Sequence, residues 1–494
     1  MEKYKIKDIL DTIICGDVLE ELKKFPDECV DCIITSPPYW GLRDYGETTY
    51  KIWGGDQDCN HEWIIEETRR PNASGGKTDY AKQKLAIKGT ENYSEFVDYH
   101  NRVTKSFFCK KCGAWYGQLG LEPTLDLYLV HLWEITDELW RVLKKTGVMF
   151  WDHGDSYSGN MGKRNGWSYV SGLGNKKDGT TINFKAKYSI PQKCLCFQNY
   201  RLILGMIDID YRILVEWRAM GKPEGKLEEM LKHPKIQRIL RNQIIWYKPN
   251  HLPSSVKDRF TNAYEPIFML VKSKKYWFDL DAVRVPHKES SYKRAQYSWK
   301  HSSRNEQATP PYTKKRWNVK ELKYNFALGK NPGDIWEIPT QPFPEAHFAT
   351  FPEKLVEPMI KAGCPQWICK KCGKARERII KGTSPCAFGL RQRDTQKGRI
   401  KGPQTKASQK EIQTYNEKET FVGEGKITLG WTDCGCNAGW EAGIVLDPFM
   451  GSGTTALVAK KLGRHFIGIE LNPEYVKMAY RRLEKEIPLF VNKI

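Results

Sequence analysis

The sequence predicts an α/β fold, because strands and helices alternate in two stretches near the two ends of its 494 residues. Residues 13–35 read as a strand, a helix and a second strand, whose apolar end Cys32-Ile33-Ile34 runs into a Ser-Pro-Pro turn. Residues 443–470 read as a strand, a tight glycine turn, a helix and another strand. In both stretches the polar residues follow a strand, so we expect the functional loops at the carboxyl ends of strands.

Regular structure is also expected in the middle of the chain. Apolar residues at helical spacing predict a helix over 125–143, and the apolar run at 147–151 predicts a strand after it. A long helical stretch over 198–241 precedes two further strands, at 243–247 and 264–271. These elements complete the expected α/β core.

Three stretches lack this periodicity. Residues 45–119 are rich in Gly, Lys, Asn and Thr, and we interpret them as an insertion that carries a small module of its own. Residues 158–187 read as a loop. The polar tract 384–430 reads as a flexible loop within a second inserted module.

Length and composition predict one main domain with insertions. With 40% hydrophobic residues the chain can bury a large core, and it is longer than one ordinary domain. No run approaches the roughly 18 apolar residues that a membrane helix requires, and the start, Met1 to Lys7, lacks the apolar stretch of a secretory signal. We therefore expect a soluble, cytoplasmic protein without a membrane partner.

The charge of the chain favours a polyanionic partner. Lys and Arg number 79 against 59 Asp and Glu, a formal net charge of +20, and cations that neutralise phosphates release counterions. A basic surface that serves only solubility is the alternative. Between Val283 and Lys330, 12 Lys and Arg stand against three Glu. Aromatic residues are interleaved with these cations, at Tyr292, Tyr297, Trp299, Tyr312, Trp317 and Tyr324. This mixture suits phosphate contact and base stacking.

The C-terminal stretch predicts a nucleoside cofactor. The strand 443–447 leads into the turn Gly451-Ser452-Gly453, a helix over 454–462, and a strand that ends in Glu470. Glycines let the backbone approach a ligand at the start of a helix, and an acid about 20 residues on can accept hydrogen bonds from ribose hydroxyls. On this motif alone a nicotinamide dinucleotide remains an alternative. Gly76-Lys77-Thr78 does not form a triphosphate-binding loop, because Pro71 stands where its first glycine would be.

Two motifs together carry a resemblance to a known family. Thr35-Ser36-Pro37-Pro38-Tyr39-Trp40 and Asp447-Pro448-Phe449-Met450-Gly451-Ser452-Gly453-Thr454-Thr455 resemble the amino-methyltransferases of DNA, which modify N4 of cytosine or N6 of adenine. Their order resembles the beta group of that family, in which the catalytic loop comes first and the cofactor-binding half last. The resemblance implies a circularly permuted, Rossmann-like, S-adenosylmethionine-dependent fold, a restriction-modification role in a prokaryote or phage, and double-stranded DNA as the partner. A cognate restriction endonuclease is a further candidate partner that the resemblance implies.

The resemblance also implies the residues of the site. The catalytic ones are Ser36, Pro37, Pro38 and Tyr39. The cofactor-binding ones are Asp17, Asp447, Phe449, Gly451, Gly453, Thr454, Glu470, His347 and Pro352. Segments 331–336 and 347–355 resemble the part of the family that covers the cofactor, and 245–250 and 255–259 also look familiar.

The chemistry explains these residue types. An exocyclic base amine shares its lone pair with the ring and is a poor nucleophile until acceptors hold its hydrogens, and Ser36 and the Pro37 carbonyl can be those acceptors. The two prolines fix the turn, and the ring of Tyr39 offers a surface on which an extruded base can stack. In the family, Ser before Pro-Pro-Tyr is more usual in N4-cytosine enzymes and Asp or Asn in N6-adenine enzymes, so cytosine is our prediction and adenine the alternative.

Other activities fit the sequence less well. A cytosine-C5 enzyme needs a nucleophilic Cys, usually after Pro, and Pro385-Cys386 lies in the polar tract far from any strand end. Methylation of RNA or protein uses related Asn-Pro-Pro-Tyr loops. A zinc-dependent DNA-binding protein without catalysis is the rival from another class, and intact motifs at both ends argue against it.

The 14 cysteines predict two zinc modules. Cys109-Lys110-Lys111-Cys112-Gly113 and Cys369-Lys370-Lys371-Cys372-Gly373 repeat one knuckle, whose two thiolates can bind one face of a tetrahedral metal. Cys59 and His61 complete the first set, and Cys434 and Cys436 the second. Reduced thiols in a core and a redox pair are the alternatives, and Cys364 and Cys386 could replace ligands of the second set. Cys194 and Cys196 form a pair without partners, which we interpret as packing.

The predicted organisation follows the motifs. The segments are 1–45 (catalytic-loop part of the core), 46–120 (first zinc module), 121–282 (core), 283–330 (target recognition), 331–363 (cofactor cover), 364–440 (second zinc module with a flexible loop) and 441–494 (cofactor binding). The first module is a candidate for a second DNA contact.

Overall fold

The structure is a computed structural model that divides into two compact units. It describes residues 2–41, 49–56, 58–69, 103–158, 190–191, 193–232, 238–290, 329–341, 350–380 and 428–487. The first unit comprises Met1–Phe278, Asp334–Gln366 and Ala442–Ile494, and the second Asp279–Gly333 and Trp367–Glu441. Most of the segments 158–187, 283–330 and 384–430 therefore lies outside the described residues.

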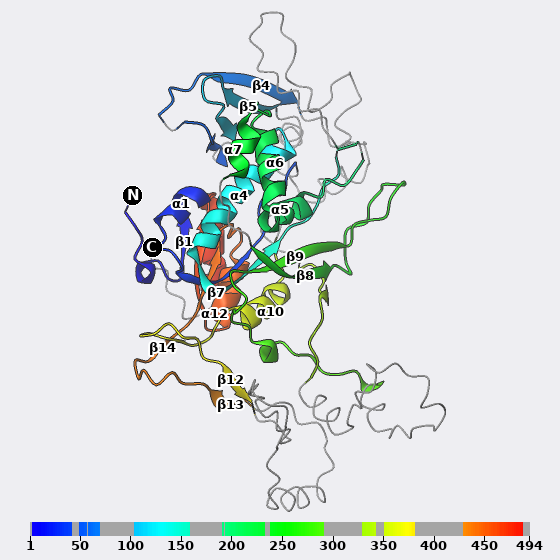
Figure 1. Ribbon diagram of the computed structural model, residues 1–494. Helices are drawn as coiled ribbons and strands as arrows, with labels where there is room; N and C mark the ends of the chain where they lie inside the picture. The colour runs from blue at the N-terminus through cyan, green and yellow to red at the C-terminus, as the bar shows by residue number, and fades with distance from the viewer. Residues whose placement is uncertain are drawn as a thin grey trace, which may run out of the picture. The chain divides into compact units, whose positions relative to one another are not determined.

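The first unit is built on an eight-stranded sheet of order β1-β16-β15-β2-β7-β9-β8-β10 (Figure 1). Its strands are β1 (Thr12–Cys15), β2 (Val30–Thr35), β7 (Leu143–Asp152), β8 (Ile239–Tyr247), β9 (Tyr264–Val271), β10 (Ile335–Glu337), β15 (Ile444–Asp447) and β16 (His465–Glu470). The five strands from β1 to β7 are parallel, and β9 runs antiparallel to both of its neighbours. The predicted α/β fold and its expected strands are confirmed.

The two C-terminal strands lie between N-terminal ones. β16 pairs with β1, where Ile467 faces Thr12, and β15 pairs with β2, where Leu446 faces Ile33. Because these strands are parallel, the loop after β2 and the loop after β15 emerge at the same edge of the sheet. The topology therefore brings together the two motifs that stand more than 400 residues apart.

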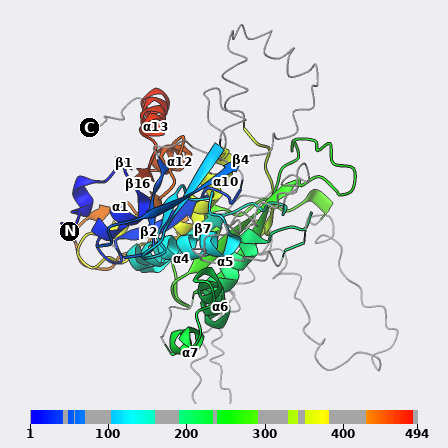
Figure 2. The ribbon, with the colours of Figure 1, turned by 90° about the horizontal axis from the view of Figure 1, so that it is seen from above.

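Helices cover both faces of this sheet (Figure 2). The helices of the unit are α1 (Val18–Lys24), α4 (Leu125–Val142), α5 (Gln198–Ile207), α6 (Ile209–Ala219), α7 (Lys226–Leu231), α10 (Glu353–Gly363), α12 (Thr454–Lys461) and α13 (Pro473–Glu486). One core cluster joins α1, α4, α5 and α6 to side chains such as Ile33, and a second joins α10, α12 and α13 to Cys32 and Ile34. The alternation along β2 is what a strand buried on both faces requires.

The helical stretch predicted over 198–241 forms α5, α6 and α7 in the described residues, and only its last residues differ from the prediction. Asp208 ends α5 and caps α6, because its carboxylate accepts a hydrogen bond from the Tyr211 amide at 3.1 Å. Gly221 and Lys222 then take φ values of +81° and +60°, which a helix does not allow. The chain re-enters the sheet at Ile239 as β8, so the last residues of the predicted helix form a strand.

The predicted insertion after the catalytic loop folds as a small sheet of order β3-β6-β5-β4 within the first unit. Its strands are β3 (Lys51–Trp53), β4 (Trp63–Arg69), β5 (Val103–Cys109) and β6 (Trp115–Gly117), all paired antiparallel. In the second unit β11 (Ile368–Cys369) pairs with β14 (Trp440–Glu441), and β12 (Arg378–Ile380) with β13 (Thr428–Trp431). In the described part of the chain, none of the helices has the length and apolarity needed to cross a membrane.

Candidate active site and metal clusters

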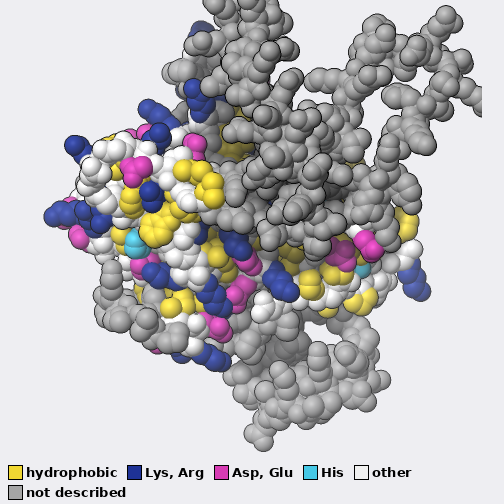
Figure 3. Space-filling view, turned by 90° about the horizontal axis from the view of Figure 1, so that it is seen from below, with side chains coloured by type: hydrophobic (Ala, Val, Ile, Leu, Met, Phe, Trp, Pro, Cys, Tyr) yellow, Lys and Arg dark blue, Asp and Glu magenta, His cyan; other side chains and the backbone are white. Residues whose placement is uncertain are grey.

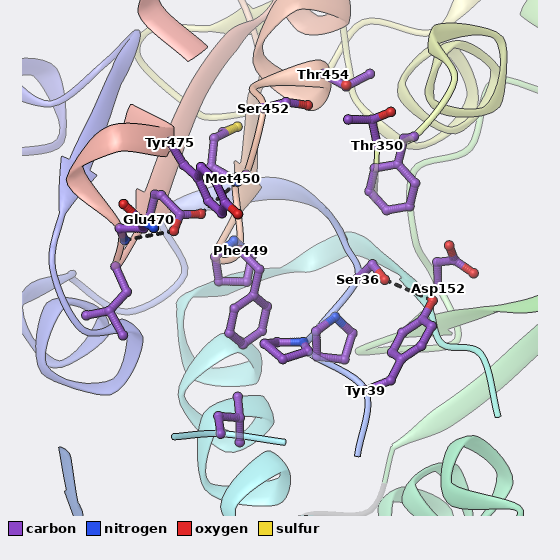
Figure 4. A pocket seen from close by; sticks show the side chains of 18 of the residues that line it. Ser36, Tyr39, Asp152, Thr350, Phe449, Met450, Ser452, Thr454, Glu470 and Tyr475 are labelled. Carbon is purple, nitrogen blue, oxygen red and sulfur yellow. Dashed lines mark hydrogen bonds between the residues drawn. The ribbon is translucent and has the colours of Figure 1, made fainter. Parts of the chain in front are cut away.

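A cavity of about 690 Å³ opens in the first unit where β1, β2, β7, β15 and β16 end. Nine of the predicted site residues line it, namely Asp17, Ser36, Pro37, Pro38, Tyr39, Phe449, Gly451, Thr454 and Glu470. In Figure 4, Glu470 and Tyr475 lie at one end, Ser36, Tyr39 and Asp152 at the other, and Phe449 between them. The cavity thus joins the two sequence motifs in one elongated site.

Glu470 marks the end of the cavity that suits a nucleoside. Glu470 is the last residue of β16, and its carboxylate accepts hydrogen bonds from the amides of Gly451, at 2.8 Å, and Asn472, at 2.9 Å. Burial raises the pKa of Glu470 to about 6. Asn472 caps α13 by accepting a hydrogen bond from the Glu474 amide at 2.9 Å. The acid is therefore held in place by the glycine turn and by the start of the next helix.

Asp447 does not line the cavity and instead contacts residues that adjoin the two motifs. Its carboxylate accepts hydrogen bonds from the hydroxyls of Thr35, at 2.8 Å, and Thr455, at 2.7 Å, and from the Phe449 amide at 3.1 Å. Burial raises its pKa to about 6. Since Thr35 precedes the catalytic loop, Asp447 ties that loop to the cofactor turn.

Three other predicted cofactor residues differ from Glu470 in their placement. Gly453 does not line the cavity, and a β-carbon there would lie 2.8 Å from that of Ala479, at a φ of +77°. Its role is close packing of the turn against α13. Pro352 is buried at the start of α10, beside Phe351 and Thr350, which do line the cavity. His347 lies outside the described residues.

Asp17 lines the cavity at the start of α1. Its Oδ1 accepts hydrogen bonds from the amides of Leu19 and Glu20, at 3.0 and 3.2 Å, and so caps the helix. The ammonium of Lys51 reaches the same oxygen at 2.6 Å. Lys51 comes from β3 of the inserted sheet, which the sequence did not place at the cavity.

The Ser-Pro-Pro-Tyr loop presents acceptors to the cavity. The Ser36 hydroxyl donates to the Tyr39 hydroxyl at 3.1 Å (Figure 4), which leaves its oxygen lone pairs available. The Pro38 carbonyl accepts a hydrogen bond from Tyr128 at 2.8 Å. Among the described residues, none donates a hydrogen bond to the carbonyl of Pro37. The two predicted acceptors, Ser36 and Pro37, are thus the ones open to a ligand.

Behind this loop, His153 organises a buried hydrogen-bond chain. Burial lowers the pKa of His153 to about 3, so the imidazole is neutral near pH 7. The Trp151 indole donates to Nδ1 at 3.3 Å, which places the proton on Nε2, 3.2 Å from the hydroxyl of Tyr128. Tyr128 can then donate to Pro38. In this series of hydrogen bonds each donor has one acceptor, from Trp151 to His153, from His153 to Tyr128 and from Tyr128 to the Pro38 carbonyl. The series therefore holds the Ser-Pro-Pro-Tyr loop in place.

Asp152 is a site residue that the sequence reasoning missed. It ends β7, lines the cavity beside Tyr39 (Figure 4), and its Oδ1 has no hydrogen-bond partner among the described residues. Burial and then the neighbouring Glu265 raise the pKa of Asp152 well above its usual range, and Lys248, which forms an ion pair with Glu265 at 2.7 Å, opposes this rise. The signal that could have identified it is its position, since an acid directly follows the apolar strand predicted at 147–151.

The first predicted metal set comes together. The ligand atoms of Cys59, His61, Cys109 and Cys112 all lie within 4.8 Å of one another. Cys59 Sγ is 3.8 Å from Cys109 Sγ, and Cys112 Sγ is 3.4 Å from His61 Nδ1. Zinc–sulfur and zinc–nitrogen bonds of about 2.3 and 2.0 Å at tetrahedral angles separate such atoms by roughly 3.5–3.8 Å. The geometry therefore fits one zinc ion.

The second predicted metal set also comes together, in the second unit. The ligand atoms of Cys369, Cys372, Cys434 and Cys436 lie within 4.8 Å of one another. The alternative ligand Cys364 is buried in the core of the first unit, at the end of α10, and Cys386 lies outside the described residues. The described cysteines are all free thiols in this structure.

Figure 3 shows how charged side chains are distributed on one face of the described residues. In Figure 3, Lys and Arg side chains are interspersed with Asp, Glu and apolar ones. The basic segment Val283–Lys330 belongs to the second unit, and residues 291–328 lie outside the described residues. Near the two ends of this segment, which we call its base, the backbones of Val285 and Lys330 exchange two hydrogen bonds, of 3.0 and 2.9 Å. Its proposed role in DNA contact stays a prediction.

Known proteins resemble this chain along most of its length. The Type II methyltransferase M.Cfr9I of Citrobacter freundii is 25% identical over 476 residues, which cover 96% of this chain and 88% of the relative. M.SmaI of Serratia marcescens is 23% identical over 471 residues, which cover 95% of this chain and 90% of that relative. The solved structure of the PvuII DNA methyltransferase, described as cytosine-N4-specific, aligns with 98% of this chain and 90% of that one, at 14% identity and a TM-score of 0.41. That structural likeness is too weak to support an assignment.

A family match decides the assignment. The model of the N6/N4 methyltransferases, described as DNA methylase, matches residues 30–366 and 439–481. These two ranges take in well over half of the chain, and they contain the Ser-Pro-Pro-Tyr loop, Asp152, the glycine turn and Glu470. The chain belongs to the DNA methylase family of amino-methyltransferases.

Proposed function

We propose that this DNA methylase transfers a methyl group from S-adenosylmethionine to the N4 amino group of a cytosine in double-stranded DNA. The observation that carries the proposal is the composition of the cavity. One end offers Glu470 to a nucleoside, and the other offers neutral acceptors on Ser36 and Pro37 next to the buried carboxyl of Asp152. A methyl donor and an amine held at the two ends would meet beside Phe449 (Figure 4).

The protein's part in the reaction is to orient the amine and to take its proton. S-adenosylmethionine supplies an electrophilic methyl group on a sulfonium. Ser36 and the Pro37 carbonyl hold the amino hydrogens, so that the nitrogen lone pair turns toward that methyl group. As the nitrogen–carbon bond forms, the carbon–sulfur bond breaks and its electrons stay on sulfur, which gives S-adenosylhomocysteine. The amino group then releases one proton, and ionised Asp152 accepts it. No covalent bond to the protein is needed, since proximity and alignment carry most of such a reaction.

Tyr39 positions the base. A base inside a duplex cannot reach a buried cavity, so the target must be extruded at a cost of a few kcal/mol, which stacking offsets in part. His153 stacks against the ring of Tyr39, with centroids 5.1 Å apart, so that ring is already fixed before a base arrives. A fixed ring loses little freedom when a base stacks on it.

Ser36 is the reason for choosing cytosine. In the family this position is more usually Ser in N4-cytosine enzymes and Asp or Asn in N6-adenine enzymes. A neutral hydroxyl can hold either amine, so N6-methylation of adenine is the outcome that would correct the base while leaving the reaction class intact.

The remaining features complete the proposed enzyme. Structural zinc in the two clusters would be held by four ligands each, with no position left for a substrate. The order of the motifs, with the catalytic loop first and the cofactor turn last, is that of a circularly permuted methyltransferase. The segment 283–330 would contact the DNA target, and the enzyme would act in the cytoplasm, with a cognate endonuclease if it belongs to a restriction-modification pair.

The decisive experiment identifies the modified nucleoside. The purified chain is incubated with S-adenosylmethionine labelled on the methyl group and with duplex DNA of mixed sequence, and the digested DNA is analysed by mass spectrometry. Labelled N4-methylcytosine is expected. Labelled N6-methyladenine would overturn the choice of base, 5-methylcytosine would overturn the amino-group mechanism, and DNA without label would favour a protein that binds but does not catalyse.

A further inference from the structure

The inserted sheet builds one wall of the cavity. Thr49, Lys51 and Trp53, on and before β3, line the cavity together with Gln118 and Leu119, which follow β6. They face the same space as Gly16, Asp17 and Val18 of the core. The wall beside the start of α1 therefore belongs to the module that also carries the first metal cluster.

A stack of side chains holds this wall in place. The Lys51 ammonium lies 3.8 Å from the ring centroid of Trp53, and Trp53 stacks on His131 of α4 with centroids 4.4 Å apart. On the same imidazole lies Trp115 of β6, with centroids 5.6 Å apart and an interplanar angle of 18°. Both tryptophans and His131 are buried, and His131 is fixed by Glu122 at 2.9 Å. The position of Lys51 thus depends on β3 and β6 together.

The metal cluster adjoins both of these strands. Trp115 follows Cys112 by three residues, within a hairpin in which the Cys109 amide donates to the Ala114 carbonyl at 2.8 Å. Gly55, two residues after Trp53, packs so closely on the cluster that a β-carbon there would lie 2.8 Å from Cys112 Sγ. The ends of β3 and β6 are therefore in contact with the metal ligands or joined directly to them.

The two strands that carry this wall are the shortest of their sheet. β3 and β6 have three residues each, so few backbone hydrogen bonds join them, and Trp53 and Trp115 supply their packing against the core. A four-ligand metal site would add a further constraint, because it would join Cys59 and His61 to the hairpin of Cys109 and Cys112.

We propose that metal in the first cluster sets the affinity of the cavity for S-adenosylmethionine, by fixing the wall that carries Lys51 and Trp53. The inference rests on the proposed function in that it takes S-adenosylmethionine as the ligand. The second cluster has no such role, because the residues that line the cavity all belong to the first unit. The two clusters of one chain therefore provide a test and its matched control.

The test compares Cys109→Ser/Cys112→Ser with Cys369→Ser/Cys372→Ser. Bound zinc is measured by atomic absorption, the dissociation constant of S-adenosylmethionine by calorimetry, and folding by circular dichroism and thermal unfolding. Each variant should lose one of two zinc ions. Cys109→Ser/Cys112→Ser should bind S-adenosylmethionine roughly tenfold more weakly than the parent, which is within the usual range of coupling between two sites. The dissociation constant of Cys369→Ser/Cys372→Ser should stay within about twofold of the parental value. Equal affinity in all three proteins would overturn the inference.

A second test uses the parent protein alone and therefore does not depend on whether Cys109→Ser/Cys112→Ser folds. If metal strengthens S-adenosylmethionine binding, then S-adenosylmethionine must strengthen metal binding by the same factor. Competition against a chelating dye of known zinc affinity should show one of the two zinc ions held about tenfold more tightly when S-adenosylmethionine is present. Lys51→Met, which leaves all metal ligands in place, should weaken S-adenosylmethionine binding without loss of zinc.

The outcomes separate this inference from the proposed function. A parent protein that does not bind S-adenosylmethionine at all would refute the proposed function. A parent that binds S-adenosylmethionine, but whose zinc affinities are unchanged by it, would refute only the coupling. A parent protein that carries no zinc in the first cluster would also refute the coupling and leave the proposed function intact.

Discussion

The imidazole of His153 stacks on the ring of Tyr39, with centroids 5.1 Å apart and planes inclined by 26°. Because burial lowers the pKa of His153 to about 3, this contact joins two uncharged rings at neutral pH. It covers one face of Tyr39, so an extruded base has to use the rest of the ring. His153 is therefore a positioning residue, which acts on the base through Tyr39.

Replacement of His153 tests this role. An aromatic pair contributes about 0.5–1.5 kcal/mol beyond the area it buries, so His153→Ala should lower kcat by up to roughly tenfold. His153→Phe keeps a ring under Tyr39 and should recover much of that loss. Steady-state rates on a duplex that the protein methylates provide the measurement, with the dissociation constant of S-adenosylmethionine as the internal control. If the Phe variant were as slow as the Ala variant, the hydrogen bonds of the imidazole would matter and the stack would not.

Ser36 and Tyr39 should be needed for transfer and not for cofactor binding. Ser36→Ala removes a neutral acceptor of the amino hydrogens, and Tyr39→Ala removes the stacking surface. Both variants should lose methyl transfer while they bind S-adenosylmethionine as the parent does, because neither residue belongs to the Glu470 end of the cavity (Figure 4). Transfer at the parental rate in both variants would refute the assignment of the catalytic loop.

Asp152 should determine how the rate depends on pH. The proposed proton acceptor must be ionised, and its pKa lies well above the usual range, so kcat should rise with pH across that raised pKa. Asp152→Asn should lower kcat by about 10²–10⁴-fold, the usual contribution of a general base. S-adenosylmethionine binding should stay near the parental value.

A neighbouring substitution makes the pH test specific. Glu265 raises the pKa of Asp152 through its negative charge, and Lys248 opposes it. Glu265→Gln removes that charge and should move the rise in kcat to lower pH, while Lys248→Met should move it to higher pH. A rise that stays at one pH in all three proteins would show that another group titrates.

Glu470 should make cofactor binding sensitive to acid. The ionised carboxylate accepts hydrogen bonds from ribose hydroxyls, and its pKa is raised to about 6 by burial. Affinity should therefore be full about one pH unit or more above the pKa, be halved near pH 6, and approach a tenfold loss per pH unit well below it, since protonation removes the acceptor. Calorimetric titrations between about pH 4.5 and 7 would show this, and Glu470→Gln should bind weakly with no such dependence. The same acid limb in the Gln variant would assign it to a different group.

The fold and the two ends of the site could be predicted because they depend on local signals. Apolar runs and turn residues identified the strands that lead to Ser36 and Glu470, and paired cysteines identified both clusters of candidate metal ligands. Asp152 and Lys51 could not be found in this way, because they enter the site only when separate strands meet. Asp447 was predicted to bind the cofactor, whereas in the structure it holds Thr35 and Thr455, a contact that depends on strand order and not on the motif itself.

The helical stretch predicted over 198–241 shows that periodicity does not determine where a helix ends. Its apolar spacing was helical, but Asp208 could act as a cap inside the run and thereby restart the helix. The residues from Ile239 onward form β8 because they pair with β9, a contact to residues farther along the chain. Periodicity alone cannot distinguish such a strand from the last turn of a helix.

Arg378 should connect the second metal module to DNA binding. Its Nε and Nη2 donate to Asp279 Oδ2 at 3.1 and 2.9 Å, and the Asp279 side chain is 8% exposed. Asp279 lies just before the basic segment Val283–Lys330, and Arg378 stands on β12 of the second module. The ion pair therefore fixes the base of the segment proposed to contact DNA.

Arg378→Ala should weaken binding of the methylated duplex by roughly tenfold, because hydrogen bonds between charged groups are worth about 1.5–3 kcal/mol. Arg376→Ala is the matched control, since Arg376 bonds to the Thr432 carbonyl within the same module. Fluorescence anisotropy at several salt concentrations separates positioning from direct contact. The slope of affinity against salt should stay unchanged in Arg378→Ala, because no phosphate contact is removed. A reduced slope would mean that Arg378 itself binds phosphate, and equal affinity in both variants would mean that the ion pair does not position the segment.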